Sequence, residues 1–404
     1  MKKELVNAIT ADEFAVAGFK AAGISCGIKK TGGLDLAIIL SDSPASVAGV
    51  FTTNSVKAAP VLIDMELVRS GKSFGVLVNS GNANACTGKK GYKDALSSVS
   101  TAEERLGLPN GSLLVASTGV IGVPMPIEKV HAGLPKLVEG LRFNGLHDAS
   151  EAIMTTDAFP KRAFVRAKIA GKTITIAGIA KGAGMICPNM ATMLAFFMTD
   201  ANIKAAALKK ALVSASDASF NSIIVDNDTS TNDTALIFAN GAAKGKEIKA
   251  SSRDFNAFVA LLTEVCVELS QMIVKDGEGA TRFIAIDVRG AGTKVEARTA
   301  ARAIASSFLV KTAFFGGDPN WGRIMAALGY SGIRMDEKNV SIHFNGVCVA
   351  RRGLDTGAEV LAAKAIKSKT VCVRVELKAG RHGAKVWTTD LSYDYVKINS
   401  AYRT

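Results

Sequence analysis

Histidine is scarce in this sequence, with four among 404 residues: His131, His147, His343 and His382. A Ser-His-Asp enzyme needs a histidine that takes the proton of its nucleophile, and none of the four stands near a candidate serine. None is spaced with a second histidine, cysteine or carboxylate in a metal-ligand pattern either. The sequence therefore predicts neither that triad nor a metal site.

Paired cysteines and long apolar runs are also missing. The six cysteines stand singly and form no CxxC motif, which is typical of free thiols in a reducing compartment. No apolar run approaches the roughly 18 residues that span a membrane, and the start MKKELVNAIT lacks a signal-peptide stretch. We expect a cytoplasmic protein without a membrane partner.

Aromatic residues make up only 6% of a chain with a net charge of +13. Nucleic-acid binding would favour basic clusters interleaved with aromatics, whereas these lysines and arginines are spread in runs no longer than a pair. The charge thus indicates a solvated basic surface, with no nucleic-acid partner and an acidic small substrate as a further option.

The chain is 48% hydrophobic and alternates apolar strand-like runs with amphipathic helices, which is enough for a large core. Clear elements are a hairpin at residues 340–351 with an Asn345-Gly346 turn and a helix at Asp254–Val274. The composition shifts near Gly290, so we expect a larger domain at 1–289 and a smaller one at 290–404.

The stretch Lys181–Asp200, KGAGMICPNMATMLAFFMTD, organises the rest. Glycines and a proline break its first half, and Met193–Met198 is a continuous apolar run typical of a strand buried on both faces. Thr192 would stand at the mouth of that strand. A threonine there can attack the carbonyl before it, and cleavage would leave an N-terminal threonine. Its own α-amino group, with a pKa near 7.7–8.0, would then serve as base. A threonine that merely enters a core strand fits the same pattern.

Three other places carry weaker signals. Ser117-Thr118-Gly119 ends an apolar strand, where a glycine could expose its backbone N–H. Glu278 stands between two glycines after a helix, which suits either a solvated turn or a site. The tail from Asp390 carries aromatics to its end, so we expect it to dock.

Several segments resemble the ornithine acetyltransferase family of arginine biosynthesis, which includes bifunctional glutamate N-acetyltransferases. The stretch KGAGMICPNMATMLAFFMTDA of this chain is similar to the self-cleaving segment of that family. VNSGNANACTG, STGVIG, MTTDAFPK, KDGEGATR and GGDPNWGR are similar to family segments, in family order, and the likeness covers essentially the whole chain. It implies an α/β (α+β) fold with layers in the order helix-sheet-sheet-helix and a smaller second domain.

The resemblance also implies site residues. Autocleavage between Ala191 and Thr192 would give chains 1–191 and 192–404, with Thr192 as the nucleophile. Thr118 and the N–H of Gly119 would form the oxyanion hole. Substrate would be bound by Thr156, Lys181, Thr192, Glu278, Asn399 and Thr404. We expect Lys181 to meet a carboxylate and Glu278 an ammonium group.

The reaction implied is a ping-pong transfer. N-acetylornithine would give its acetyl group to Thr192, and glutamate would take it up as N-acetylglutamate. Bifunctional members also accept acetyl from acetyl-CoA, which makes acetyl-CoA a candidate second donor rather than a cofactor. No cofactor is expected, and the family suggests a heterotetramer of two cleaved pairs. Two alternatives remain open: a related self-processing aminopeptidase or amidohydrolase, with water as acceptor, and a non-enzymatic basic binding protein.

Overall fold

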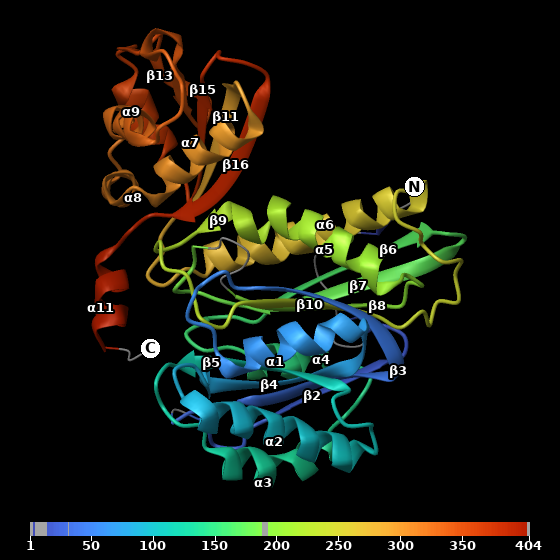
Figure 1. Cartoon of the computed structure of the whole chain (residues 1–404). Coiled ribbons are helices and arrows are strands. Elements are labelled where there is room, and N and C mark those ends of the chain that lie inside the picture. The colour runs from blue at the N-terminus through green and yellow to red at the C-terminus, as the bar shows by residue number, and fades with distance from the viewer. Residues whose placement is uncertain (1–2, 5–13, 31, 188–192, 402–404) are drawn as a thin grey trace.

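A computed structural model describes residues 3–4, 14–30, 32–187 and 193–401 of the chain. Within these residues two sheets are formed, a larger one below and a smaller one above in Figure 1. The larger sheet contains β1 (Lys3–Glu4), β2 (Phe19–Ile24), β3 (Leu36–Phe51), β4 (Lys72–Asn82), β5 (Leu113–Val120), β6 (Lys161–Ile169), β7 (Lys172–Lys181), β8 (Leu194–Thr199) and β10 (Thr234–Ala239).

The 16-residue strand β3 divides the larger sheet into two layers. Its first half pairs with β2 and β4, its second half pairs with β10, and the register with β4 shifts between Leu40 and Ala45. Such an irregularity bends a strand and increases its twist. The layer of β2, β4 and β5 therefore folds over the layer of β6, β7, β8 and β10, and one apolar cluster fills the space between them.

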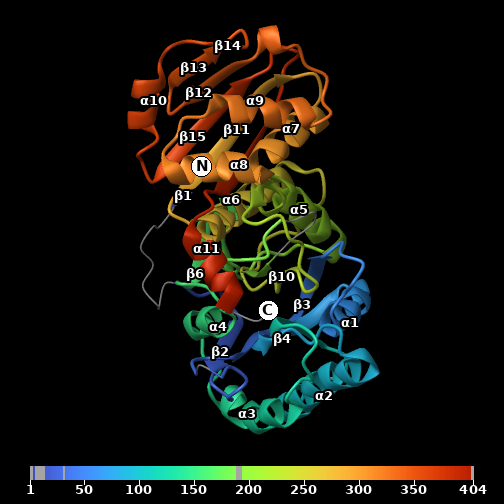
Figure 2. The same ribbon diagram turned by 90° about the vertical axis from the view of Figure 1, so that its left-hand side faces the viewer.

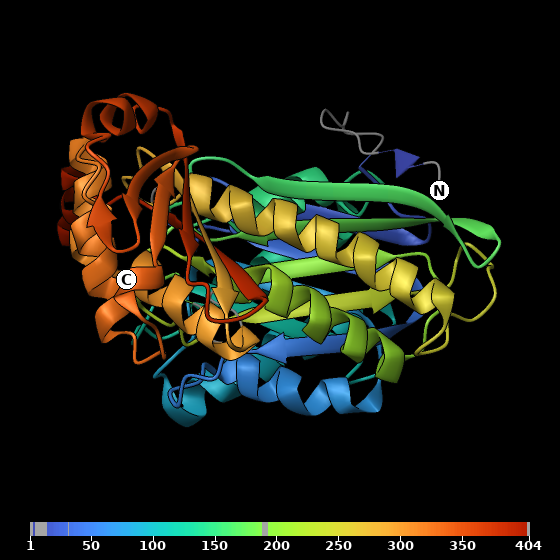
Figure 3. The same ribbon diagram turned by 90° about the horizontal axis from the view of Figure 1, so that it is seen from above.

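Helices cover both outer faces. One layer packs on α5 (Ala205–Ala218) and α6 (Arg253–Lys275), and the other on α2 (Gly88–Leu106) and α3 (Ile127–Glu139). Figure 3 shows α5 and α6 lying across the strands. Two further helices, α1 (Ala59–Leu67) and α4 (Leu146–Ala152), complete this part of the fold. The expected order of helix, sheet, sheet and helix is thus confirmed.

Strand β8 shows why this order follows from the sequence. Leu194, Phe196 and Met198 point into the cluster between the two layers, whereas Ala195 and Phe197 point into the cluster under α5 and α6. Because side chains alternate along a strand, a strand buried on both faces must be apolar throughout. The expectation for Met193–Met198 is confirmed, with the strand beginning one residue later.

The smaller sheet has seven strands among the described residues. They are β9 (Ile223–Ile224), β11 (Phe283–Ala291), β12 (Ser341–Phe344), β13 (Val347–Arg351), β14 (Leu354–Asp355), β15 (Thr370–Glu376) and β16 (His382–Thr389). Its helices are α7 (Lys294–Ser306), α8 (Phe308–Gly316), α9 (Trp321–Tyr330) and α10 (Glu359–Ala365), and Figure 2 shows them around this sheet. Strand β11 crosses the boundary predicted at 289/290, and that division into domains stays a prediction.

Two expectations about local structure have different outcomes. The hairpin of β12 and β13 is confirmed, since Asn345 and Gly346 both have positive φ angles, as its tight turn requires. The glycines and the proline of Phe314–Arg323 predict a loop, but this stretch is mostly helix: α8 ends at Gly316 and α9 begins at Trp321. Only the Gly-Asp-Pro-Asn part is a connection between them.

Helix α6 is long and apolar enough, by length and composition alone, to cross a membrane. The sequence-based expectation concerned an uninterrupted apolar run, and Glu264 and Glu268 interrupt this one. Half of this apolar window is buried inside the protein, where residues such as Phe258, Leu262 and Leu269 pack under the larger sheet. This burial is that of a core helix.

Candidate functional site

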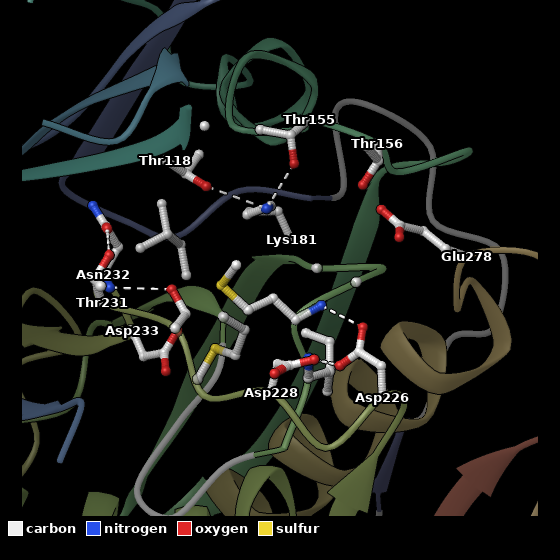
Figure 4. A pocket seen from close by; sticks show the side chains of 18 of the residues that line it. Thr118, Thr155, Thr156, Lys181, Asp226, Asp228, Thr231, Asn232, Asp233 and Glu278 are labelled. Carbon is white, nitrogen blue, oxygen red and sulfur yellow. Dashed lines mark hydrogen bonds between the residues drawn. The ribbon is translucent and has the colours of Figure 1, made fainter. Parts of the chain in front are cut away.

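One pocket brings together residues from distant parts of the chain. It has a volume of about 190 Å³ and lies where β5 and β7 end and β8 begins (Figure 4). Six of the residues named from the sequence line it: Thr118, Gly119, Thr156, Lys181, Glu278 and Asn399. They come from five segments, of which the first is the strand β5 and the last is the C-terminal helix α11 (Tyr393–Ala401).

The remaining three named residues, Ala191, Thr192 and Thr404, lie outside the described residues. The described residues beside the expected cleavage segment do reach the pocket, because Ile186 and Met193 both line it. The pocket is therefore adjacent to both sides of that segment.

Lys181 is the buried cation of the pocket. Its Nζ donates hydrogen bonds to Thr155 Oγ1 at 2.8 Å and Thr118 Oγ1 at 3.3 Å (Figure 4). Burial lowers its pKa, and the carboxylate of Asp157 opposes that shift. Sequence reasoning missed Thr155, although it stands beside Thr156 in the MTTDAFPK segment.

Behind Lys181 lies a buried charge network. Asp157 accepts hydrogen bonds from Lys161 Nζ at 2.7 Å and from the Gly182 N–H at 2.6 Å, and Lys161 also contacts Asp276 at 2.6 Å. Burial alone would raise the pKa of Asp157, but the charges of Lys181 and Lys161 lower it to about 2. The ionised Asp157 therefore holds both the backbone after Lys181 and the local positive charge in place.

Glu278 faces the pocket from the turn after α6. Its carboxylate accepts a hydrogen bond from Asn399 Nδ2 at 2.9 Å, and its N–H donates to the Ala183 carbonyl at 2.9 Å. A Cβ on Gly184 would lie 2.4 Å from this carboxylate, so only glycine lets the two approach. The glutamate, the loop after β7 and the tail thus meet at one point.

The tail docks as expected, but as a helix. Ser392, just before α11, donates a hydrogen bond to the Gly279 carbonyl, and the Tyr395 hydroxyl is hydrogen-bonded to Asp226. Burial raises the pKa of Tyr395, so its phenol stays neutral. Tyr395 and Asn399 face the pocket, whereas Tyr393 is 84% exposed.

The polar stretch between β9 and β10 forms another wall of the pocket. It includes Asp226, Asp228, Thr231, Asn232 and Asp233. The polar composition of this stretch predicts a turn between two strands, which the structure confirms, but sequence reasoning missed its part in the pocket. Nine consecutive polar residues, Asp226–Thr234, are the one signal in the sequence that could have pointed to it.

These side chains offer charge and hydrogen bonds rather than a metal site. Across residues 3–4, 14–30, 32–187 and 193–401, no group of three histidine, cysteine or acidic side chains is placed to hold a metal ion. One wall carries the ammonium group of Lys181, and the facing walls carry carboxylates, among them Glu278 and Asp226. Such a pocket suits a small molecule that bears both charges, such as an amino acid.

Comparison with known proteins gives consistent matches. The model of the ArgJ family matches residues 20–404. The arginine biosynthesis bifunctional protein ArgJ of Geobacter sulfurreducens is 51% identical over 391 residues, which are 96% of this chain and 100% of that protein. The protein of that name from Caldanaerobacter subterraneus is 48% identical over 96% of this chain and 97% of its own length.

A solved structure also matches. The crystal structure of the arginine biosynthesis bifunctional protein argJ from Bacillus halodurans is 40% identical, with a TM-score of 0.51. The match covers 52% of this chain and 100% of that one.

Proposed function

The chain belongs to the ArgJ family and is an acyltransferase of arginine biosynthesis, and from this premise we propose that it cleaves itself and then moves an acetyl group through an N-terminal threonine. The donor would be N-acetylornithine and the acceptor glutamate, with acetyl-CoA as a second donor. The observation that carries the proposal is the convergence of Thr118, Lys181 and Glu278 on the pocket next to Ile186 and Met193.

Self-cleavage would begin with the hydroxyl of Thr192. Its Oγ attacks the carbonyl carbon of Ala191, the peptide C–N bond breaks, and the nitrogen takes a proton to become the free α-amino group. Water then hydrolyses the ester, which leaves the Ala191 carboxylate and the Thr192 hydroxyl. The solved Bacillus halodurans chain supports a division, because its whole length corresponds to about half of this chain.

Acetyl transfer would use the same hydroxyl. The α-amino group of Thr192 would take the hydroxyl proton while Oγ attacks the acetyl carbon of N-acetylornithine. Thr118 and the Gly119 N–H would stabilise the oxyanion. Ornithine would leave with the proton on its α-nitrogen, and the glutamate amine would then attack the acetyl ester to restore Thr192.

Substrate binding would follow from the charges of the pocket. We assign the substrate carboxylate to Lys181 and an ammonium group to Glu278, because the two side chains carry opposite charges on different walls. Thr156, Asn399 and Thr404 would complete the set. This chemistry needs no cofactor, and a heterotetramer of two cleaved pairs in the cytoplasm remains the expected state.

Mass spectrometry of the denatured protein tests the first step. We expect two fragments, 1–191 and 192–404, and a single uncleaved mass for Thr192→Ala, which should also lose transfer. A Thr192→Ala chain that stays active would overturn the mechanism.

Assays with purified cleaved protein test the second step. Acetyl should pass to glutamate from N-acetylornithine, and separate assays with acetyl-CoA decide the second donor. Release of free acetate at the same rate without glutamate would instead support the aminopeptidase or amidohydrolase alternative.

A further inference from the structure

In the turn just before the expected cleavage segment, two successive backbone N–H groups are bound by one carboxylate. Asp226 accepts hydrogen bonds from the N–H groups of two successive residues, Met185 at 2.6 Å and Ile186 at 2.7 Å. Met185 has a φ of +57°, a left-handed conformation that costs a non-glycine residue about 1–2 kcal/mol. The carboxylate is buried, and both bonds are charge-assisted, which makes them strong enough to hold the strained turn.

The segment that contains Asp226 contacts the chain on both sides of the cleavage segment. On the first side, Val225 N–H donates to the Ile186 carbonyl at 2.6 Å and Thr229 Oγ1 to the Cys187 carbonyl at 3.1 Å. On the second side, the Thr234 N–H donates to the Met193 carbonyl at 3.0 Å. The stretch 225–234 is therefore a template that fixes the backbone on both sides of the expected cleavage segment.

We propose that Asp226 is a positioning residue for self-cleavage, which orients the chain before the scissile bond through the N–H groups of Met185 and Ile186. This inference rests on the proposed function, since it concerns the cleavage step of that mechanism. Asp226 takes up no proton in that step. Its part is to hold the strained turn so that hydroxyl and carbonyl stay within reach of each other.

The substitution Asp226→Asn tests this geometry. An amide has one acceptor oxygen and turns its NH₂ group toward the second backbone N–H, so one of the two bonds is lost. We expect cleavage to slow at least tenfold, measured by denaturing mass spectrometry at intervals after cell-free synthesis of the full chain. We expect the cleaved fraction of Asp226→Asn to keep most of its kcat/KM for acetyl transfer. The fold-loss in kcat/KM should be smaller than the fold-loss in cleavage rate, each relative to the unsubstituted protein.

Asp390 offers a matched control. It is also buried and accepts hydrogen bonds from two successive N–H groups, Thr281 at 2.8 Å and Arg282 at 3.0 Å, both on one oxygen, while its other oxygen accepts from the Thr281 hydroxyl. Unlike Asp226, it holds the turn that follows Glu278. We expect Asp390→Asn to raise the KM for N-acetylornithine more than it slows cleavage. Equal effects of the two substitutions on cleavage would overturn the inference, because any loss of a buried carboxylate would then suffice.

Two measurements separate positioning from misfolding. Thermal unfolding of Thr192→Ala with and without Asp226→Asn shows whether the uncleaved chain still folds. If the double variant does not fold, the cleavage rate of Thr229→Val tests the template instead. This near-isosteric change removes only the hydrogen bond to the Cys187 carbonyl. A severalfold slower cleavage supports the template, and an unchanged rate overturns it.

Different results would overturn the proposed function and this inference. If the unsubstituted chain never cleaves, the self-cleavage mechanism falls and this inference with it. If it cleaves and Asp226→Asn cleaves as fast, only the inference is wrong.

Discussion

Gly119 has no room for a side chain. Its φ is +133°, and a Cβ there would lie 2.4 Å from the carbonyl carbon of Gly81 on the paired strand β4. The nearest atoms belong to the backbone of β4, which cannot move without disturbing its pairing with β5. We therefore expect Gly119→Ala to lower the free energy of unfolding by about 2–3 kcal/mol. It should also displace the proposed oxyanion N–H and abolish most transfer, as measured by denaturant unfolding and acetyl-transfer rates.

Gly122 provides the control for that substitution. It too has a left-handed φ, +77°, but a Cβ on it would meet nothing within 4 Å. Gly122→Ala should therefore cost only about 1 kcal/mol, the penalty of the backbone conformation, and should retain transfer. Similar losses in both variants would show that the close approach of β4 and β5 at Gly119 is not what matters.

At the residue scale, the sequence predicted side chains that stand in recognisable motifs and missed those that act on them from a distance. Lys181 and Glu278 were named through the family resemblance, because charge and spacing alone left them open to ordinary roles. Thr155 and Asp226 were missed because their contacts, to Lys181 and Ile186, join residues 26 and 40 positions apart. Only the folded chain shows such pairs.

The C-terminal helix is the element whose function is easiest to isolate. Asn399 of α11 contacts Glu278, whereas residues 225–229 make most of the hydrogen bonds to the loop before the cleavage segment. We expect removal of Ser400–Thr404 to raise the KM for N-acetylornithine while slowing cleavage much less. Steady-state kinetics and denatured masses of the truncated chain measure the two effects, and wild-type kinetics with N-acetylornithine would contradict the expectation.

At the element scale, a strong helical period predicted secondary structure correctly, whereas a mixed pattern did not. The helix expected at Asp254–Val274 is α6, within one residue at each end, because its apolar face and its Ser252 cap agree. The tail alternates apolar and polar residues, yet it is a helix, since it is held at Ser392 and Asn399 rather than by burial of one face. The sequence pattern of the tail cannot show these contacts, because they join it to residues more than a hundred positions away.

At the scale of the whole molecule, the pocket depends on both sheets. The smaller sheet supplies the end of β16, from which Asp390 holds the turn after Glu278, and α11 then returns to the pocket. The two-residue strand β9 belongs to the smaller sheet although it directly precedes the polar turn of Asp226. The sequence predicted two domains but could not show that a strand of the first one pairs in the smaller sheet. A strand of two residues is too short to produce a periodic pattern in the sequence.

Lys311 on α8 lies at this junction and predicts how stability responds to pH. It is 1% exposed, and its Nζ donates to Thr388 Oγ1 and to the carbonyl and hydroxyl of Thr389, at 2.6–3.0 Å. Burial lowers its pKa from 10.5 to about 7, although the charges of Asp226 and Asp390 oppose the shift. Between these values the unfolded chain binds more protons than the folded one, so the free energy of unfolding rises with pH.

The cost of burying this amine is therefore fully present below about pH 7 and is relieved as the pH rises toward 10.5. Its slope is at most about 1.4 kcal/mol per pH unit. We expect Lys311→Met to flatten the rise of Tm between pH 7 and 9. Lys204→Met, which removes a largely exposed partner of Glu247, should keep the slope of the unsubstituted protein, because surface ion pairs contribute only ~0–1 kcal/mol. Equal slopes for Lys311→Met and the unsubstituted protein would show that this buried amine does not titrate where its surroundings place it.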